Sequence, residues 1–352
     1  MNSAKHDFSK SLIAWYFGNK RDLPWRQTKD PYKVWLSEII LQQTRVEQGM
    51  PYYKKFVLEF PTVKDLAAAP EQKVLKLWQG LGYYSRARNL HATAKIIVND
   101  YAGKFPQTYK ELLALKGVGD YTASAIGSIC FNLPTAVVDG NVYRGLSRVF
   151  GIDTPIDTSA GIKEFKALAQ ELLDATQPGN FNQALMEFGA RQCKPKSPDC
   201  NTCIVQASCV AKRDNRIASL PVKKGKVKLK KRYINYVVVN SDLGQTQLQQ
   251  RTNKGIWHKL YEFPNLETTT LATLTDILNS QVFKDTTQGA AASQVSLFNS
   301  EPIVHKLSHQ HIYASFWIVG LPALKQNSVY WAKIQDYPVP VLMERFINSF
   351  GF

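Results

Sequence analysis

Apolar residues recur every three or four positions through the first half of the chain, from residue 5 to residue 190. This spacing places apolar side chains along one face of a helix, so a helical region is expected there. Short breaks that contain glycine or proline separate the helices, for example at Phe60-Pro61-Thr62. The clearest helical segments are Val34–Val46, Val74–Trp78, Arg86–Val98 and Ala160–Leu173.

The pattern changes after residue 232. Tyr233–Asn240 and Ile312–Val319 are rich in β-branched and aromatic residues, which is typical of strands. Leu271–Leu278 and Val341–Ile347 have helical spacing instead. The sequence therefore predicts a mixed α/β domain over residues 233–352.

A basic segment joins these two parts. Residues 222–232 hold seven Lys or Arg residues and no acid. We expect a solvated linker at 223–232, able to contact DNA, between a helical domain over 1–222 and the α/β domain. A chain of 352 residues also favours two domains over one.

The net charge of the chain indicates what kind of molecule it binds. Lys and Arg outnumber Asp and Glu by 44 to 28, a formal net charge of +16. Such an excess indicates a polyanion, most often nucleic acid, although it can also serve only to keep a protein in solution. Met1–Phe17 lacks the apolar core of a signal peptide, and no stretch of ~18 residues is apolar. We expect no membrane partner and a cytoplasmic, nucleoid-associated protein.

Four of the five cysteines crowd into residues 193–209, which argues against a secreted disulfide framework. Their spacing suits a [4Fe–4S] cluster or a four-cysteine zinc site, with free thiols as the remaining alternative. It is not the paired Cys-x2-Cys of zinc ribbons, so iron–sulfur is favoured. A bound cluster would fix Lys194 and Lys196 for phosphate contact, whereas Cys130 is expected in the core. The motif is Cys193-x6-Cys200-x2-Cys203-x5-Cys209.

A Gly-Val-Gly sequence at Gly117–Gly119 lies between two expected helices. Two glycines one residue apart let the backbone turn tightly and approach another chain closely. The free N–H groups of the following helix would then suit a DNA phosphate. The alternative is only a tight turn between helices. Leu77–Tyr83 resembles Leu115–Tyr121, with a helix end, a glycine hairpin and another helix.

Two acids stand out. Asp139 precedes a glycine, so it can cap a helix or act as a carboxylate that stabilises positive charge at a site. Glu38 has Val34, Trp35 and Leu41 as helical neighbours, so it lies on an apolar face. A desolvated carboxylate has a raised pKa and can serve as a general acid. The alternative for Glu38 is a boundary residue paired with Lys or Arg.

Together these motifs resemble a known family. The Gly-Val-Gly hairpin, Val138–Asn141 and the four-cysteine motif, in this order, are similar to the endonuclease III superfamily of DNA glycosylases. Leu23–Arg26, Trp35–Thr44 and Gly80–Leu90 resemble, more narrowly, the MutY family of adenine DNA glycosylases. The resemblance covers nearly all of residues 8–222. It implies a mainly α helix-hairpin-helix glycosylase domain with an iron–sulfur loop at 193–209.

Tyr121 distinguishes between the subfamilies. Bifunctional members of the superfamily have a lysine at this position, whose amine forms a Schiff base before strand cleavage. Tyr143 likewise lacks the amine that some MutY proteins carry there. The resemblance therefore implies an enzyme that removes a base without cutting the strand.

The second domain resembles the MutT-like (Nudix-fold) lesion reader of the same family. Gly255–Pro264 is similar to the segment before a pyrophosphohydrolase box, but the box itself is missing, so nucleotide hydrolysis is not expected. Family members read 8-oxoguanine with Phe-Ser-His. This chain has Leu307-Ser308-His309, so Ser308 is the expected reader and Leu307 departs from the family pattern.

The resemblance also implies roles for individual residues. Glu38 would protonate adenine and Asp139 would stabilise the sugar cation, with Tyr121 and Asn141 positioning Asp139 and the sugar. Other residues would line the adenine pocket (Trp25, Arg26 and Gln183) or fill the gap left in the duplex (Gln43, Leu81 and Tyr83). The substrate would be double-stranded DNA with adenine opposite 8-oxoguanine or guanine, bound by a monomer.

Three rival functions remain open at the level of sequence. A bifunctional enzyme acting on oxidised pyrimidines is disfavoured by Tyr121 and by the long C-terminal domain. A non-catalytic DNA-binding scaffold is disfavoured by the pairing of Glu38 with Asp139. A nucleotide hydrolase is disfavoured by the missing box.

Overall fold

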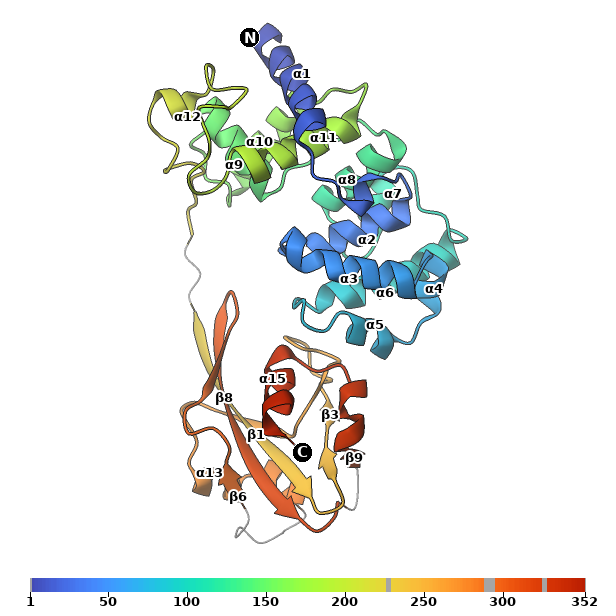
Figure 1. The fold of residues 1–352 in the computed structure, drawn as a ribbon, viewed down its shortest axis with the longest axis vertical. Helices are drawn as coiled ribbons and strands as arrows, with labels where there is room; N and C mark the ends of the chain where they lie inside the picture. Colours follow the sequence, from blue (N-terminus) through green and yellow to red (C-terminus); the bar gives the residue numbers. More distant parts are fainter. Residues whose placement is uncertain (1, 226–228, 288–294, 325–327, 352) are drawn as a thin grey trace. The chain divides into compact units, whose positions relative to one another are not determined.

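The computed structural model describes residues 2–225, 229–287, 295–324 and 328–351 (Figure 1). Contacts divide the chain into two compact units. The first unit comprises Met1–Ala68 and Asn89–Gly225, and the second comprises Ala69–Arg88 and Lys226–Phe352. Residues 69–88, which the sequence placed in the helical domain, thus cluster with the C-terminal part. No helix in the described ranges is long and apolar enough to cross a membrane.

The first unit is helical, as the periodicity predicted. Its helices are α1 (Asn2–Asn19), α2 (Pro31–Leu41), α3 (Val46–Glu59), α4 (Val63–Ala68), most of α6 (Ser85–Asp100), α7 (Tyr109–Ala114), α8 (Asp120–Phe131), α9 (Gly140–Phe150), α10 (Ser159–Leu172), α11 (Pro178–Glu187) and α12 (Val210–Arg213). A short 3-10 turn, Pro24–Arg26, follows α1, and a π-helical turn, Phe188–Gln192, continues α11.

The core of the first unit forms where α1, α9, α10 and α11 meet. Leu12, Leu146, Phe165 and Phe181 are fully buried there. The side chain of Phe188 packs against the same cluster, with its ring 5.7 Å from that of Trp15 in an edge-to-face arrangement. The packing of these four helices around one core therefore fixes the positions of α9 and α11.

The predicted helix Val34–Val46 is two helices. The first, α2, ends at Leu41, and Gln43 takes a left-handed φ of 54° before α3 begins at Val46. A Cβ on Gly49 would lie 2.8 Å from the Leu41 side chain, so α3 packs closely against the end of α2. The apolar spacing continues through the break because both helices face the same core, and the period alone could not reveal the turn.

The two glycine turns seen in the sequence have the expected form. The first separates α5 (Glu71–Leu77) from α6, and the second separates α7 from α8. Gly117 has a φ of 78°, and a Cβ there would lie 2.7 Å from that of Asn89, so only glycine fits. Gly119 has open space around its Cα, so another chain could approach its backbone.

The second unit is mixed α/β, as predicted. Its strands are β1 (Lys230–Ser241), β2 (Gln245–Gln247), β3 (Gln249–Gln250), β4 (Tyr261–Glu262), β5 (Asn265–Thr268), β6 (Val295–Leu297), β7 (Ile303–Lys306), β8 (Gln310–Leu321) and β9 (Ser328–Tyr330). In addition to α5, its helices are α13 (Leu274–Asn279), α14 (Gln281–Thr287) and α15 (Val341–Phe350). A 3-10 turn lies at Trp331–Asp336.

The main sheet is built on two long parallel strands, β1 and β8, which run side by side in Figure 1. The strand order is β5-β1-β8-β6, and β7 also pairs with β8. Val237 lies opposite Trp317, and their side chains pack with Ile277 and Phe283 of α13 and α14. On the alternate positions Phe316 stacks on Phe346 of α15, with 4.1 Å between ring centroids. Both faces of β1 and β8 are therefore covered, which explains their continuous apolar runs.

The basic segment 223–232 is only partly a linker. Residues 226–228 lie outside the described residues. The backbone N–H groups of Lys224 and Gly225 donate to the Asp157 carboxylate at 2.8 and 3.0 Å. β1 begins at Lys230, and Arg232 forms an ion pair with Glu267 at 2.6 Å. Strand pairing with β8 therefore begins before the expected end of the linker.

Candidate active site

A cavity of about 170 Å³ lies in the first unit, lined by residues of the 3-10 turn and of α2, α8, α9 and α11. The structure brings together seven of the residues singled out in the sequence: Trp25, Arg26, Glu38, Tyr121, Asp139, Asn141 and Gln183. They come from segments up to 158 residues apart, so the cavity depends on the packing of the helices.

Glu38 enters the cavity from the last turn of α2. This helix begins with Pro31 and is capped by Asp30, whose carboxylate accepts from the Tyr32 N–H at 3.0 Å. The Tyr121 hydroxyl donates to Oε2 of Glu38 at 2.7 Å. Burial raises the pKa of Glu38 to about 7, against the lowering effect of that hydrogen bond and with a further increase from the Asp139 charge. Near neutral pH Glu38 therefore holds its proton in a large fraction of molecules.

Asp139 has both of the roles that the sequence allowed, as a helix cap and as a carboxylate that lines the cavity. It is the N-cap of α9, and its Oδ1 accepts from the backbone N–H groups of Asn141 and Val142 at 2.9 and 2.8 Å. Its Oδ2 accepts from the Asn141 side-chain amide at 2.8 Å, and the residue lines the cavity. Burial raises the pKa of Asp139, while these three hydrogen bonds lower it. The net pKa is raised, and the three donors and the helix dipole limit that rise.

Tyr121 contacts a different carboxylate from the one expected. The sequence suggested that it positions Asp139, but its hydroxyl donates to Glu38 and also lies 3.2 Å from Sδ of Met186. Burial and the neighbouring carboxylates raise the pKa of Tyr121 well above 10, so the phenol stays neutral. Among the described residues that line the cavity there is no lysine.

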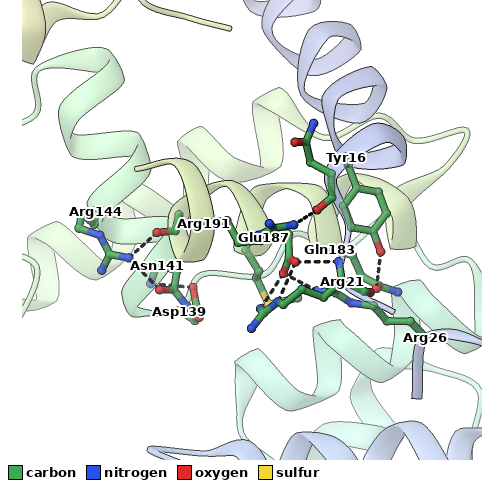
Figure 2. Close-up of polar contacts among 12 residues, drawn as sticks. Tyr16, Arg21, Arg26, Asp139, Asn141, Arg144, Gln183, Glu187 and Arg191 are labelled. Carbon is green, nitrogen blue, oxygen red and sulfur yellow. Dashed lines mark hydrogen bonds and ion pairs between the residues drawn. The ribbon is translucent and has the colours of Figure 1, made fainter. Parts of the chain in front are cut away.

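Sequence reasoning missed a third carboxylate, Glu187 at the end of α11. It is fully buried and accepts from the Arg21 guanidinium at 2.8 Å through each oxygen, and from Arg26 at 2.7 Å (Figure 2). Burial alone would raise the pKa of Glu187, but the hydrogen bonds from the two arginines lower it to about 2. Arg26, expected to face adenine, is therefore already paired with Glu187.

A signal for Glu187 was present in the sequence. It lies four residues after Gln183, so both side chains share one face of α11. The Tyr16 hydroxyl donates to the Gln183 side-chain carbonyl at 2.8 Å, which fixes the orientation of that amide. An acid on the same helical face as a predicted pocket residue was the sign that Glu187 also faces the cavity.

A chain of hydrogen bonds links Asp139 to the cysteine segment. The Asn141 side-chain carbonyl accepts from Nη2 of Arg144 at 2.8 Å (Figure 2). The same guanidinium donates to the Gly189 carbonyl at 2.6 Å and, through Nε, to the Cys193 carbonyl at 2.8 Å. The amide that orients Asp139 is thus held by an arginine that also holds the backbone of Cys193.

The four cysteines of the 193–209 motif all line one small cavity of about 20 Å³. Arg148, which is buried, lies with Nη1 3.5 Å from Sγ of Cys193 and donates to the Lys194 carbonyl at 2.8 Å. Burial, together with the charges of the other three thiols, raises the pKa of Cys203 to about 11. No three His, Cys, Asp or Glu side chains of the described ranges are close enough to ligate one metal ion.

Leu81, Tyr83 and Ser308 are brought together in the second unit. They line a pocket of about 580 Å³ with Trp257 and Leu307. Ser308 is exposed in the turn between β7 and β8, where its hydroxyl lies 3.3 Å from Nδ1 of His309. Gln43, the other expected gap-filling residue, is exposed in the first unit, in the turn after α2, and does not line the active-site cavity.

Comparison with known proteins identifies the family. Residues 36–171 match the HhH-GPD superfamily of base excision DNA repair proteins, and residues 235–349 match the NUDIX domain. The adenine DNA glycosylase of Buchnera aphidicola subsp. Baizongia pistaciae is 36% identical over 319 residues, which are 89% of this chain and 86% of that protein. The chain belongs to the adenine DNA glycosylase family. The resemblance inferred from the motifs is confirmed, and the protein is a glycosylase of base excision repair.

Other relatives agree with this family membership. The human adenine DNA glycosylase is 44% identical over 215 residues, which are 58% of this chain and 39% of that protein. A thermostable thymine-DNA glycosylase of known structure matches with a TM-score of 0.56 and 30% identity, over 60% of this chain and 98% of that one. An endonuclease III–DNA complex, at 22% identity and a TM-score of 0.52 over 60% of this chain and 97% of that one, shares the fold. The predicted fold, a helix-hairpin-helix glycosylase domain followed by a Nudix-type domain, is confirmed.

The raised pKa of Glu38 has a consequence for the stability of this family member. An acid whose pKa is higher in the folded state binds more protons there, so stability falls as pH rises from the unfolded value of about 4.5 through 7. Glu38→Gln removes this loss and keeps an acceptor for Tyr121. We expect its melting temperature to exceed that of the unsubstituted protein by roughly 2–4 °C at pH 8, and by less at pH 5. Calorimetry at the two pH values measures this, and a difference independent of pH would contradict it.

Proposed function

We propose that the protein removes adenine paired with 8-oxoguanine or guanine from double-stranded DNA and leaves the strand intact. One observation carries the proposal. Glu38 and Asp139 line one cavity in different hydrogen-bonding environments, and the pKa of Glu38 is raised to about 7. A protonated carboxylate facing a second carboxylate held by three hydrogen-bond donors suits acid-assisted cleavage of a glycosidic bond.

The substrate base must leave the duplex to reach this cavity. Adenine within the stack is inaccessible, so the nucleotide would be flipped out. Trp25, which is buried and packs edge-to-face on Tyr53 at 5.0 Å, offers an apolar wall for the base. Gln183 offers an amide whose orientation is fixed by Tyr16, suited to the polar edge of adenine. Arg26, which is held by its ion pair with Glu187, would form a further part of the wall and place a positive charge there.

Glu38 would act as the general acid. Its proton passes to N7 of adenine while the bond between N9 and C1′ breaks, and the bonding electron pair stays with the base. Adenine then leaves neutral and the sugar becomes an oxocarbenium ion. Asp139, anionic at the N-terminus of α9, would stabilise that cation or trap it covalently, with Asn141 holding its Oδ2. Water then adds at C1′ and loses a proton, which gives an abasic site.

The absence of a suitable amine supports base removal alone. Strand cleavage through a Schiff base needs a lysine within reach of C1′. Of the described residues, none that lines the cavity is a lysine, and the Tyr121 hydroxyl is bonded to Glu38.

DNA would bind across the hairpin at Gly117–Gly119. Gly119 is the N-cap of α8, where no side chain caps the helix, so its first N–H groups are suited to a phosphate. The net charge of +16 and the exposed Lys194 and Lys196 would add sequence-independent attraction. We propose a monomer as the binding species.

The pocket of the second unit would recognise the base opposite adenine. Ser308 is exposed at the tip of a hairpin and has a hydroxyl for 8-oxoguanine. Leu81 and Tyr83 would fill the gap left by the flipped nucleotide, a role that the family resemblance also gives to Gln43. Since the pyrophosphohydrolase box is missing, this domain would read and not hydrolyse.

We propose a [4Fe–4S] cluster as the group that the four cysteines hold. Their spacing is not the paired Cys-x2-Cys of zinc ribbons, and all four line one cavity. In such a cluster each thiolate binds a different iron. Cys193, Cys200, Cys203 and Cys209 would hold the cluster, which when bound cross-links the loop and takes no part in base removal.

The decisive experiment is single-turnover excision with excess enzyme on duplexes that carry adenine opposite 8-oxoguanine, guanine or thymine. We expect release opposite 8-oxoguanine and guanine, and a loss of about 10²–10⁴-fold in Glu38→Gln with DNA binding preserved. For the unsubstituted protein the rate should fall as pH rises above 7, because Glu38 loses its proton. Near-normal excision by Glu38→Gln would rule out the assignment, and a catalytically silent but DNA-binding wild type would favour the scaffold.

A second experiment tests the absence of strand cleavage. The unsubstituted protein should cut the strand only after added alkali or heat. Tyr121→Lys places an amine beside Glu38 and Asp139, so we expect borohydride to trap a covalent protein–DNA adduct with this variant alone. Its base release should be slower, because a cation beside Glu38 lowers the pKa of the acid. Trapping of the unsubstituted protein at the same level would show that another amine reaches the sugar.

A third experiment tests the cluster. The protein isolated without oxygen should contain about four irons per chain. Cys203→Ser should lose iron and the associated visible absorbance, and should bind DNA more weakly because Lys194 and Lys196 are no longer fixed. The matched control is Cys130→Ser, in α8 and outside the motif, which should keep its iron. Stoichiometric zinc in place of iron would overturn the cluster.

A further inference from the structure

The turn between α5 and α6 has an unusual backbone. Gly80, Gly82 and Tyr83 have φ values of 97°, 73° and 48°. Glycine adopts such values readily, but a tyrosine in the left-handed region needs surrounding contacts to hold it there. The Tyr83 side chain is 48% exposed, although an aromatic ring gains most from burial. Something in the fold therefore keeps this ring at the surface.

The Gly82 carbonyl is one point at which the turn is held. It accepts from the indole Nε1 of Trp78 at 3.0 Å and from Nη2 of Arg86 at 3.3 Å. Trp78 is fully buried, so its indole is an immobile donor. Both bonds fix the peptide that immediately precedes Tyr83, and the backbone N–H of Arg86 also donates to the Tyr83 carbonyl at 2.9 Å.

Arg86 is the residue that connects this turn to the ring. Its guanidinium lies 5.1 Å from the centroid of the Trp78 ring and 5.6 Å from that of Tyr83. The side chain is 8% exposed, and burial lowers the pKa of Arg86 to about 10. A desolvated cation attracts an aromatic ring more strongly than an exposed one does. The inner face of Tyr83 is thus held by a buried charge while the rest of the ring remains accessible.

We propose that Arg86 is a positioning residue that holds Tyr83 in the exposed orientation from which its ring enters the base stack. The inference rests on the proposed role of Tyr83 in filling the gap beside the flipped adenine. Arg86 itself, buried beneath the turn, acts through Tyr83. Its charge and its bond to Gly82 keep the ring in place before DNA arrives, so less conformational freedom is lost on binding.

A double-mutant cycle tests this inference. Single-turnover excision and DNA affinity are measured for Arg86→Met, Tyr83→Ala and the double variant on adenine opposite 8-oxoguanine. Arg86→Met keeps the aliphatic stem and removes the cation and donors. We expect it to lower the rate or affinity about tenfold, and to cause no further loss when Tyr83 is already alanine. Arg86→Lys should restore part of the loss, since it keeps the cation.

A spectroscopic readout separates positioning from general stability. Insertion of the ring unstacks neighbouring bases, so 2-aminopurine placed beside the mismatch should brighten with the unsubstituted protein and less with Arg86→Met. The control is Lys55→Met, which removes an exposed lysine 5.9 Å from the Tyr52 ring and one positive charge. It should retain the fluorescence change and show only a small loss of affinity.

The outcomes are distinct. Additive losses in the cycle, or an unchanged 2-aminopurine signal in Arg86→Met, would overturn the positioning role and leave that of Tyr83 intact. Full activity of Tyr83→Ala would reject Tyr83 as the gap-filling residue and the inference with it. Loss in both single variants, none added in the double variant and partial rescue by lysine would establish it.

Discussion

Two carboxylates face one cavity, and the way the chain supplies hydrogen-bond donors to them governs the chemistry. Asp139 caps α9 and receives two backbone N–H groups and an amide, which favour its charged form. Glu38 receives one phenol hydroxyl and is otherwise desolvated, so its pKa rises to about 7. The charge of Asp139 raises the pKa of Glu38 further, which favours the proton on Glu38. The start of α9 places backbone N–H donors beside Asp139, so Asp139 is suited to be the anion and Glu38 the acid.

Glu187 shows that burial alone does not set the state of a carboxylate. Its side chain is fully buried, yet its pKa is lowered to about 2, whereas burial raises that of Glu38. The difference lies in its partners, because Arg21 and Arg26 supply full positive charges where Tyr121 supplies a neutral hydroxyl. Removal of one arginine would leave a buried charge incompletely paired, which is costly. This ion-paired group gives the cavity a fixed wall on the α11 side, and the Arg26 charge moderates the pKa of Glu38 from there.

The sequence predicted what depends on local pattern. Helical period located α6, α10 and α15, and strand composition located β1 and β8. Local pattern could not reveal the break after Leu41, because the apolar face continues across it. Nor could it reveal the pairing of Arg21 with Glu187, which joins residues 166 positions apart. Asp139 was ambiguous for another reason: capping and facing a cavity use different oxygens of one carboxylate, so the two interpretations never excluded each other.

The two glycine turns that looked alike in the sequence expose different chemical groups at their surfaces. At Gly117–Gly119 the positive φ of Gly117 and the open space beside Gly119 leave backbone N–H groups uncovered, which suits a charged oxygen. At Gly80–Tyr83 the second glycine and the tyrosine after it are left-handed as well, and what is exposed is an aromatic ring. The spacing of the glycines is the same in both turns. The buried side chains beneath the second turn, Trp78 and Arg86, account for the difference, because they bind the Gly82 carbonyl and leave the next side chain to project outward.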